Sequence, residues 1–225
     1  RAMAFAAREL RQLGYEYVAG PTGAPSDWVL RQRDDSQKGF EWKGQADYDA
    51  VGDAVVLHVQ AQLSLLCGLM PLPLPRASAD CHTVVYATED LCGDGDESAR
   101  HDKPVLLLVC GSAPGGAAGV WGRSICINES LHAGAMFDYI LRAKSLGWSV
   151  VVANPNVNDV NGVPATGSEC PQLHLQTLWR DYFDDWRPSC VLVVAHSYGA
   201  PNVVHLLKAE EGARARVKAV AFTDG

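Results

Sequence analysis

Residues 190–202 read CVLVVAHSYGAPN, an apolar run followed by a tight turn and the start of a helical segment. Ser197 stands at the apex of the turn, with the small residues Ala195 and Gly199 two positions to either side. The spacing is one substitution from G-x-S-x-G, a strand–turn–helix motif that exposes a serine side chain, because Ala195 replaces the first glycine. A strand and a helix that meet so sharply leave room only for small side chains. The stretch therefore predicts a turn with Ser197 in an unusual backbone conformation.

Similar apolar runs recur along the chain and alternate with segments of helical spacing. The runs cover residues 105–110, 148–153, 190–195 and 217–222, and helices are predicted over 133–146, 173–186 and 202–211. Strands that are apolar throughout are typical of a parallel sheet that helices cover on both faces. Right-handed crossovers between the strands then predict a three-layer α/β fold with a mostly parallel sheet.

Weaker patterns precede these runs. In chain order they predict a helix over 1–13, strands over 15–19 and 39–42 joined by a polar connection 21–38, an amphipathic helix over 45–66, an extended proline segment 71–75 and a strand over 83–88. We expect residues 1–45 to form an N-terminal extension and residues 46–225 to form the α/β domain. Because the chain starts without Met and stops directly after an apolar run, we expect it to be a piece of a longer protein.

The composition excludes several classes of protein. Hydrophobic residues make up 48% and charged residues 20% of the 225 residues, as in a globular protein rather than a disordered one. Acidic residues outnumber basic ones by 26 to 19, which gives a net charge of −7. Nucleic-acid-binding surfaces are normally basic, so the charge argues against direct nucleic-acid binding. The apolar stretches are interrupted before the about 18 residues of a membrane span, so no membrane association is predicted.

The seven cysteines are scattered singly and lack the spacing of a zinc site or a redox pair. They are Cys67, Cys81, Cys92, Cys110, Cys126, Cys170 and Cys190. An odd number of thiols, some of them inside apolar runs, predicts reduced cysteines without disulfides. No metal site and no cofactor are predicted, because the glycine-rich segment 111–119 lacks the Lys-Ser/Thr of a phosphate-binding loop.

Ligands of open parallel sheets bind at the carboxyl ends of the strands, so the residues after each run are candidate site residues. Ser197 is the candidate nucleophile. The run 105–110 leads into Gly111 and Ser112, whose backbone N–H groups could stabilise an oxyanion together with that of Tyr198 at the helix start. The alternatives are an ordinary flexible loop after the run and a turn at Ser197 that serves folding alone.

Asp224 follows the run 217–222 and is the candidate acid, because serine enzymes of this architecture carry their residues in the order Ser…Asp…His. A turn formed with Gly225 is an equally supported alternative. All seven histidines precede Asp224, and His196 adjoins Ser197 with its side chain expected to point away. A general base would therefore have to come from beyond Gly225.

Four further side chains are predicted to line a pocket at this edge, namely Asn154, Asn156, His196 and Arg123. The two asparagines flank Pro155, which forces an extended turn, and they can bond loop amides or face the pocket. Arg123 is expected to form an ion pair with Glu129, and binding of an anionic ligand is the alternative.

Five segments, taken in this order, resemble the Argonaute-binding-protein (Arb) domain family. They are residues 105–111, the stretch WGRSICINES at 121–130, the triplet NPN at 154–156, VAHSYG at 194–199 and residues 219–224. The likeness covers residues 40–225 and is greatest to the animal-type members, which are cotranscriptional regulators.

The resemblance implies an α/β-hydrolase-like fold, truncated here before its C-terminal strands. It also implies a protein-interaction role in RNA silencing, chromatin or splicing regulation, with Argonaute, chromatin or splicing factors as partners in the nucleus or cytoplasm. No settled catalytic activity comes with it. Family members usually carry His-Gly-Asn-Gly where this chain has Cys110-Gly111-Ser112-Ala113, and animal relatives have a histidine shortly after the final Thr-Asp.

Three hypotheses about the function follow from the sequence. The first is a protein-interaction module, which the resemblance, the altered loop and the acidic segments 90–97 and 181–185 support. The second is a serine hydrolase of small esters or acyl-peptides that uses Ser197, Asp224 and a histidine beyond residue 225. Direct RNA binding is a third reading, and the net charge argues against it.

Overall fold

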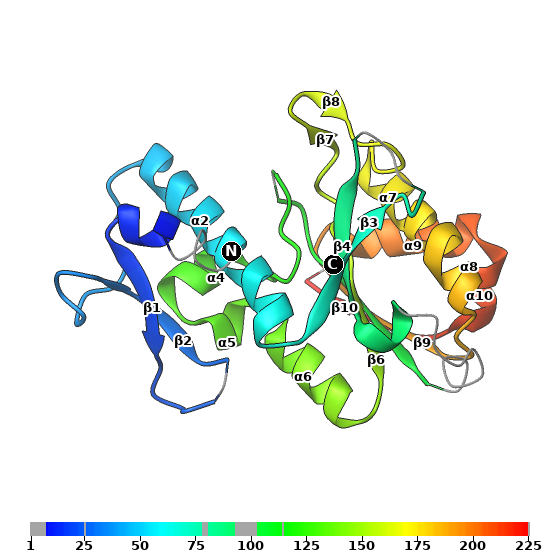
Figure 1. The fold of residues 1–225 in the computed structure, drawn as a ribbon, viewed down its shortest axis with the longest axis horizontal. Helices are drawn as coiled ribbons and strands as arrows, with labels where there is room; N and C mark the ends of the chain where they lie inside the picture. Colours follow the sequence, from blue (N-terminus) through cyan, green and yellow to red (C-terminus); the bar gives the residue numbers. More distant parts are fainter. Residues whose placement is uncertain (1–7, 25, 78–80, 93–102, 114, 225) are drawn as a thin grey trace. The chain divides into compact units, whose positions relative to one another are not determined.

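The computed structural model describes residues 8–24, 26–77, 81–92, 103–113 and 115–224 (Figure 1). The chain divides into two compact units. The first unit consists of residues 1–67 and 119–140, and the second of residues 68–118 and 141–225. The first carries a two-stranded hairpin with helices, and the second carries the main sheet.

Within the described residues, the second unit is built on a six-stranded sheet in the order β10-β9-β5-β6-β4-β3. The strands are β3 (Leu69–Leu74), β4 (Thr83–Thr88), β5 (Val105–Val109), β6 (Ser149–Val152), β9 (Val191–His196) and β10 (Val217–Thr223). The four neighbours β10, β9, β5 and β6 run parallel, while β4 is antiparallel to β6 and β3 is antiparallel to β4. The four predicted apolar runs are these parallel strands, which confirms an α/β protein with a mainly parallel sheet.

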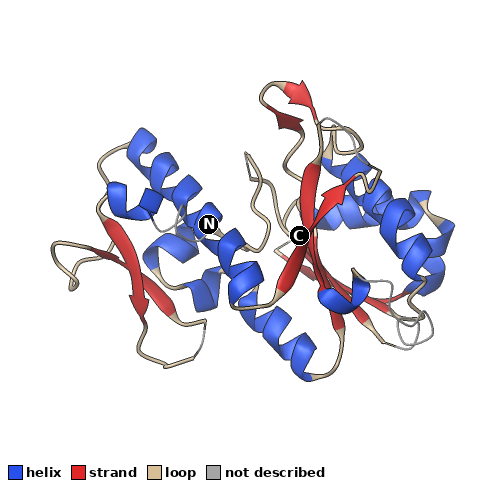
Figure 2. Cartoon of the chain, in the orientation of Figure 1, coloured by secondary structure: helices blue, strands red, loops and turns tan. Residues whose placement is uncertain are grey.

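Helical segments connect the strands of the sheet (Figure 2). They are η1 (Glu89–Leu91), α6 (Phe137–Ser145), α7 (Pro171–Leu178), the π-helical turn η2 (Trp179–Phe183), α8 (Asp184–Trp186), α9 (Gly199–Ala209) and α10 (Glu211–Arg216). Trp179 stacks on Phe183 with ring centroids 4.7 Å apart, and both rings belong to one buried cluster with Val191 and Val193 of β9. Burial of a side chain such as Phe183 contributes about 1.5–3 kcal/mol, so this cluster holds the helices of residues 171–186 on the sheet.

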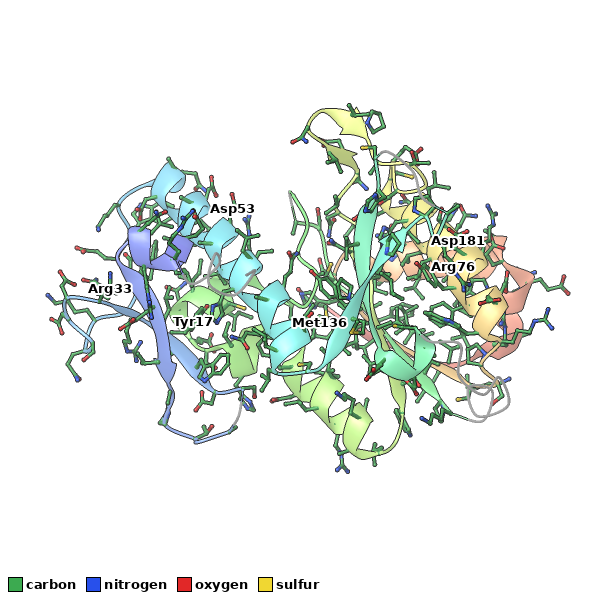
Figure 3. All side chains as sticks on the ribbon, in the orientation of Figure 1. Tyr17, Arg33, Asp53, Arg76, Met136 and Asp181 are labelled. Carbon is green, nitrogen blue, oxygen red and sulfur yellow. The ribbon has the colours of Figure 1, made fainter. Side chains whose placement is uncertain are left out.

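The edge strand β3 is protected against pairing with a further strand. Pro71 and Pro73 have no N–H, and proline is tolerated in sheets chiefly at such edges. The hydroxyl of Tyr182 donates a hydrogen bond to the carbonyl of Pro73, and the backbone N–H of Arg76 donates to the Asp181 carboxylate at 2.9 Å. Figure 3 labels Arg76 and Asp181 at this edge. The extended conformation predicted from the prolines is confirmed.

The first unit is a β-hairpin on which helices pack. Its elements are β1 (Tyr15–Ala19), β2 (Trp28–Gln32), α2 (Gln45–Leu65), α4 (Arg123–Asn128) and α5 (Leu131–Gly134), preceded by helical residues 8–12. The hydroxyl of Tyr17 donates to the carbonyl of Cys126 at 2.9 Å and joins β1 to α4. Residues 1–7 of the helix predicted over 1–13 lie outside the described residues.

Two sequence predictions in this region were wrong. The second hairpin strand is β2, inside the predicted polar connection, and not residues 39–42, because buried Leu30 pairs opposite Tyr17. Phe40 instead packs its ring 5.9 Å from that of Tyr15. The single helix predicted over 133–146 is split into α5 and α6, because Ala135 forms a β-bridge with Val120 between them.

The compositional features also have structural counterparts. All seven cysteines lie within the described residues, and all are thiols rather than disulfides. In the described parts of the chain, no group of His, Cys, Asp and Glu side chains is arranged to hold a metal ion. Among the same residues, no helix has both the length and the apolar composition needed to cross a bilayer.

Candidate functional site

Ser197 lies in the turn between β9 and α9, at the carboxyl edge of the sheet. Its φ is +49°, in the left-handed region that side chains other than glycine rarely adopt. The Ser197 N–H donates to the carbonyl of Thr223 at 2.9 Å, and the Ser197 carbonyl accepts from the N–H of Ala200 at 2.9 Å. The strand–turn–helix with an unusual conformation at Ser197 is therefore confirmed. Its role as a nucleophile stays a prediction.

The turn is pressed against the end of β5, so that a side chain does not fit at Gly199 and would be crowded at Gly111. A Cβ atom at Gly199 would lie 2.7 Å from the carbonyl oxygen of Cys110 and 2.9 Å from that of Val109. A Cβ atom at Gly111 would lie 3.0 Å from the Cβ of Ser197. The loop after β5 and the serine turn are thus in direct contact, which places Gly111, Ser112 and Tyr198 beside Ser197 at one edge.

The turn after β6 also reaches this edge. Asn156 donates from Nδ2 to the carbonyl of Gly111 at 2.8 Å. Asn154 is 5% exposed, and its Oδ1 has no hydrogen-bond partner within the described chain. A Cβ atom at Gly116 would lie 3.0 Å from that Oδ1, so the glycine-rich loop covers Asn154. Of the predicted pocket residues, the two asparagines therefore do meet the loop after β5.

A buried histidine that sequence reasoning did not single out fixes this turn. His174 of α7 is fully buried, and its Nε2 accepts the backbone N–H of Asn154 at 3.1 Å. Since Nε2 is an acceptor, Nδ1 carries the proton and donates to Ser168 Oγ at 2.9 Å. Ser168 Oγ donates in turn to the carbonyl of Val157 at 2.8 Å. Burial lowers the pKa of His174 from 6.5 to about 3, so the imidazole stays neutral.

The remaining polar residues of this edge lie farther along it. His196 places Nδ1 3.1 Å from Thr223 Oγ1 of the neighbouring strand. Asp224 follows β10 with φ +52° and an exposed side chain. Among the described residues, no hydrogen bond joins Ser197 Oγ to a histidine. This part of the chain thus holds a serine and a carboxylate at one edge without a base on the serine.

Arg123 lies in the first unit and forms an ion pair with Asp53 of α2, at 3.2 Å between Nη1 and Oδ1. The ion pair predicted with Glu129 was wrong, because Arg123 opens α4 and Glu129 follows its end, six positions later. Residues at that spacing do not share a helix face. The place of Arg123 in the pocket stays a prediction.

Comparison with known proteins links the chain to one family. The Arb2 domain model matches residues 29–161, more than half of the chain. The chain is 30% identical over 200 residues to a FAM172 family protein homolog of Caenorhabditis elegans, which covers 87% of this chain and 60% of that protein. It is 26% identical over 255 residues to the Cotranscriptional regulator ARB2A homolog of Dictyostelium discoideum, and that match covers 96% of this chain and 61% of the relative. The Homo sapiens Cotranscriptional regulator ARB2A is 28% identical over 158 residues, a match that covers 69% of this chain and 33% of the human protein. The chain thus spans about three fifths of the length of the first two relatives.

We expect Gly199→Ala to destabilise the second unit by about 1–3 kcal/mol, because the new Cβ would overlap two backbone carbonyls. Gly39→Ala is the matched control, since a Cβ there lies no closer than 3.6 Å to its neighbours and the change should stay within about 0.5 kcal/mol. Urea denaturation measures both. Equal midpoints for the two variants would contradict the packing described at Gly199.

His174 predicts that stability falls in mild acid. Below pH 6.5 the unfolded chain binds a proton at His174 that the folded protein excludes until about pH 3, so the free energy of unfolding drops as the pH falls. The slope from this one residue approaches 1.4 kcal/mol per pH unit, and the loss between pH 7 and pH 5 is about 2 kcal/mol. His58, whose pKa burial lowers to about 4, adds in the same direction.

The measurement is the urea midpoint between pH 7 and pH 5 for the wild type and for His174→Gln. The variant should be less stable at pH 7 and should show a flatter pH dependence. His205→Gln, a change on the exposed side of α9, should keep the wild-type slope. An unchanged slope in His174→Gln would mean that His174 is not held neutral.

Proposed function

Because this chain belongs to the Arb2 domain family, we propose that it is a regulatory module that acts in co-transcriptional control by binding other proteins. The observation that carries the proposal is its similarity to proteins named cotranscriptional regulators over most of its length. A nuclear location and chromatin, splicing or Argonaute proteins as partners are the finer parts of this proposal. The division into an N-terminal extension, residues 1–45, and an Arb-type domain, residues 46–225, stays a prediction.

An α/β-hydrolase-like scaffold is part of the same proposal. Its support is the parallel order β10-β9-β5-β6 with a serine turn at the carboxyl end of β9.

The acidic segment 181–185 is helical and partly neutralised, since Arg76 pairs with Asp185 and Arg216 with Asp184. Residues 93–97 of the acidic segment 90–97 lie outside the described residues. The helical segment therefore adds less acidic surface for a partner than the sequence suggests.

Serine hydrolase activity is the second candidate, because one specific observation favours it. Ser197 holds a left-handed conformation with Gly111 packed on its Cβ, an arrangement that exposes a serine beside a loop of backbone amides. Asp224 lies at the end of the adjacent strand, where a carboxylate could orient a histidine. That histidine would be supplied by residues beyond 225.

The regulatory proposal predicts that the full-length protein crosslinks in nuclei to proteins of the transcribing and splicing machinery. Ser197→Ala should crosslink to the same partners and restore the same nascent transcripts in depleted cells, because contacts between folded surfaces do not need the hydroxyl. Mass spectrometry of the crosslinked proteins and nascent-RNA sequencing measure the two effects. Absence of nuclear partners for the wild type would overturn the proposal.

The second candidate predicts a different dependence on Ser197. A fluorophosphonate probe should label the full-length wild type and should not label Ser197→Ala. Residues 1–225 alone should stay unlabelled, because a serine needs a base within about 2.6–3.2 Å to react. If neither the full-length protein nor residues 1–225 is labelled, the hydrolase proposal is rejected and the regulatory module remains as the proposed function. Strong Ser197-dependent labelling of residues 1–225 would show that a histidine of this segment serves as the base.

A further inference from the structure

We infer that Asn156 is a positioning residue that aims the Ser112 amide at the space beside Ser197 and so completes a two-donor hole for the carbonyl oxygen of an acyl substrate. The inference rests on the second proposed function, the serine hydrolase, and adds to it the residue that orients the hole. Every residue in the argument belongs to the second unit.

The order of the strands places Asn156 and Ser197 on opposite flanks of one loop. β5 lies between β6 and β9 in the sheet. Gly111 follows β5, Asn156 follows β6, and Ser197 follows β9. The three parallel strands end at the same edge, so Gly111 has Asn156 on its β6 flank and Ser197 on its β9 flank.

The hydrogen bond from Asn156 determines the orientation of the next peptide group. Asn156 Nδ2 donates to the Gly111 carbonyl at 2.8 Å, so this carbonyl points to the β6 flank. A trans peptide is planar, and its N–H points opposite to its C=O. The N–H of Ser112 therefore points to the β9 flank. Ser197 lies on this β9 flank, because its Cβ is 3.0 Å from the position that a Cβ at Gly111 would take.

The second donor of the hole is the N–H of Tyr198, the residue that caps α9. α9 is 11 residues long, and the positive end of its dipole favours negative charge at this position. Within the described part of the chain, neither the Ser112 nor the Tyr198 amide donates a hydrogen bond to the protein. Two amide donors on either side of the serine are what a carbonyl oxygen needs as it gains negative charge, and we take these two as the pair.

Asn156 is itself held before any ligand arrives. On one side of it, the Asn154 N–H is bound by buried His174. On the other side, Asn158 donates to the carbonyls of Pro155 at 2.9 Å and Ser168 at 2.7 Å. The turn is thus fixed on both sides of Asn156, so its carboxamide can hold the Gly111 peptide without an ordering cost at the moment of reaction.

The test uses the full-length protein and a fluorophosphonate probe. In the labelling step a bond forms between Ser197 Oγ and phosphorus, the P–F bond breaks and fluoride leaves, and the serine proton passes to the histidine supplied beyond residue 225. The phosphoryl oxygen then occupies the hole. Asn156→Asp keeps the size of the side chain but replaces the donor by an acceptor that repels the Gly111 carbonyl. Asn161→Asp, at the tip of the exposed β7–β8 hairpin (Asp159–Val160 and Val163–Pro164), is the matched control.

For Asn156→Asp we expect the maximal labelling rate constant to fall by about 10²–10³-fold, as for loss of one oxyanion donor. The probe concentration at half-maximal rate should change less than about threefold, since the hole acts on the reacting state. Asn161→Asp should label at the wild-type rate. Asn156→Gln, which keeps an amide donor, should label at least tenfold faster than Asn156→Asp. Asn156→Leu, which lacks the donor and carries no charge, should show the same fall relative to the wild type and provides the measurement if the aspartate variant does not fold.

The outcomes separate the two proposals. If the wild type is labelled and the labelling rate of Asn156→Asp is within twofold of it, the role of Asn156 is overturned and the hydrolase proposal stands. A folded Asn156→Gln that labels as slowly as Asn156→Asp also overturns the positioning role. A wild type that does not label at all overturns the hydrolase proposal, and the inference about Asn156 fails with it.

Discussion

The close approach between the end of β5 and the start of α9 is the constraint on which the site depends. The carbonyl oxygens of Val109 and Cys110 occupy the space that a side chain at Gly199 would need. Because α9 begins so near β5, the chain has to turn within two residues after β9. That turn puts Ser197 into a left-handed conformation and brings Gly111 against it. The position of the serine is therefore a consequence of how tightly one helix packs on a neighbouring strand.

A second constraint comes from polar groups that are buried beneath the site. A buried imidazole nitrogen without a hydrogen bond costs free energy, and both nitrogens of His174 have partners, the Asn154 amide and Ser168. These bonds fix the turn after β6. Through Asn156, this turn also contacts the loop after β5. The carboxyl ends of β5 and β6 are thus connected by a polar contact as well as by the sheet's ladder of hydrogen bonds.

The central strands and the serine turn could be predicted because their constraints are local in sequence. A strand covered on both faces has to be apolar at every position, as β5 and β6 are, and a sharp turn has to carry small residues two positions from its apex. The position of β2, the break between α5 and α6 and the partner of Arg123 depend on contacts with distant residues. Arg123 bonds to Asp53, 70 positions away, and His174 has no sequence signal that separates it from other helical histidines.

The strain at Ser197 bears on the choice between the two functions. A side chain other than glycine in a sparsely populated backbone region destabilises the fold by about 1–3 kcal/mol, and the surrounding structure has to compensate. A turn that served folding alone would be relieved of this strain by glycine, which adopts positive φ without a steric penalty. Binding of protein partners through the outer surface requires the sheet and its helices but not a hydroxyl at this apex. The strained serine, together with two amides that the described chain leaves without acceptors, is therefore the part of the structure that the proposed regulatory role does not explain and that the proposed reaction with a carbonyl group would explain.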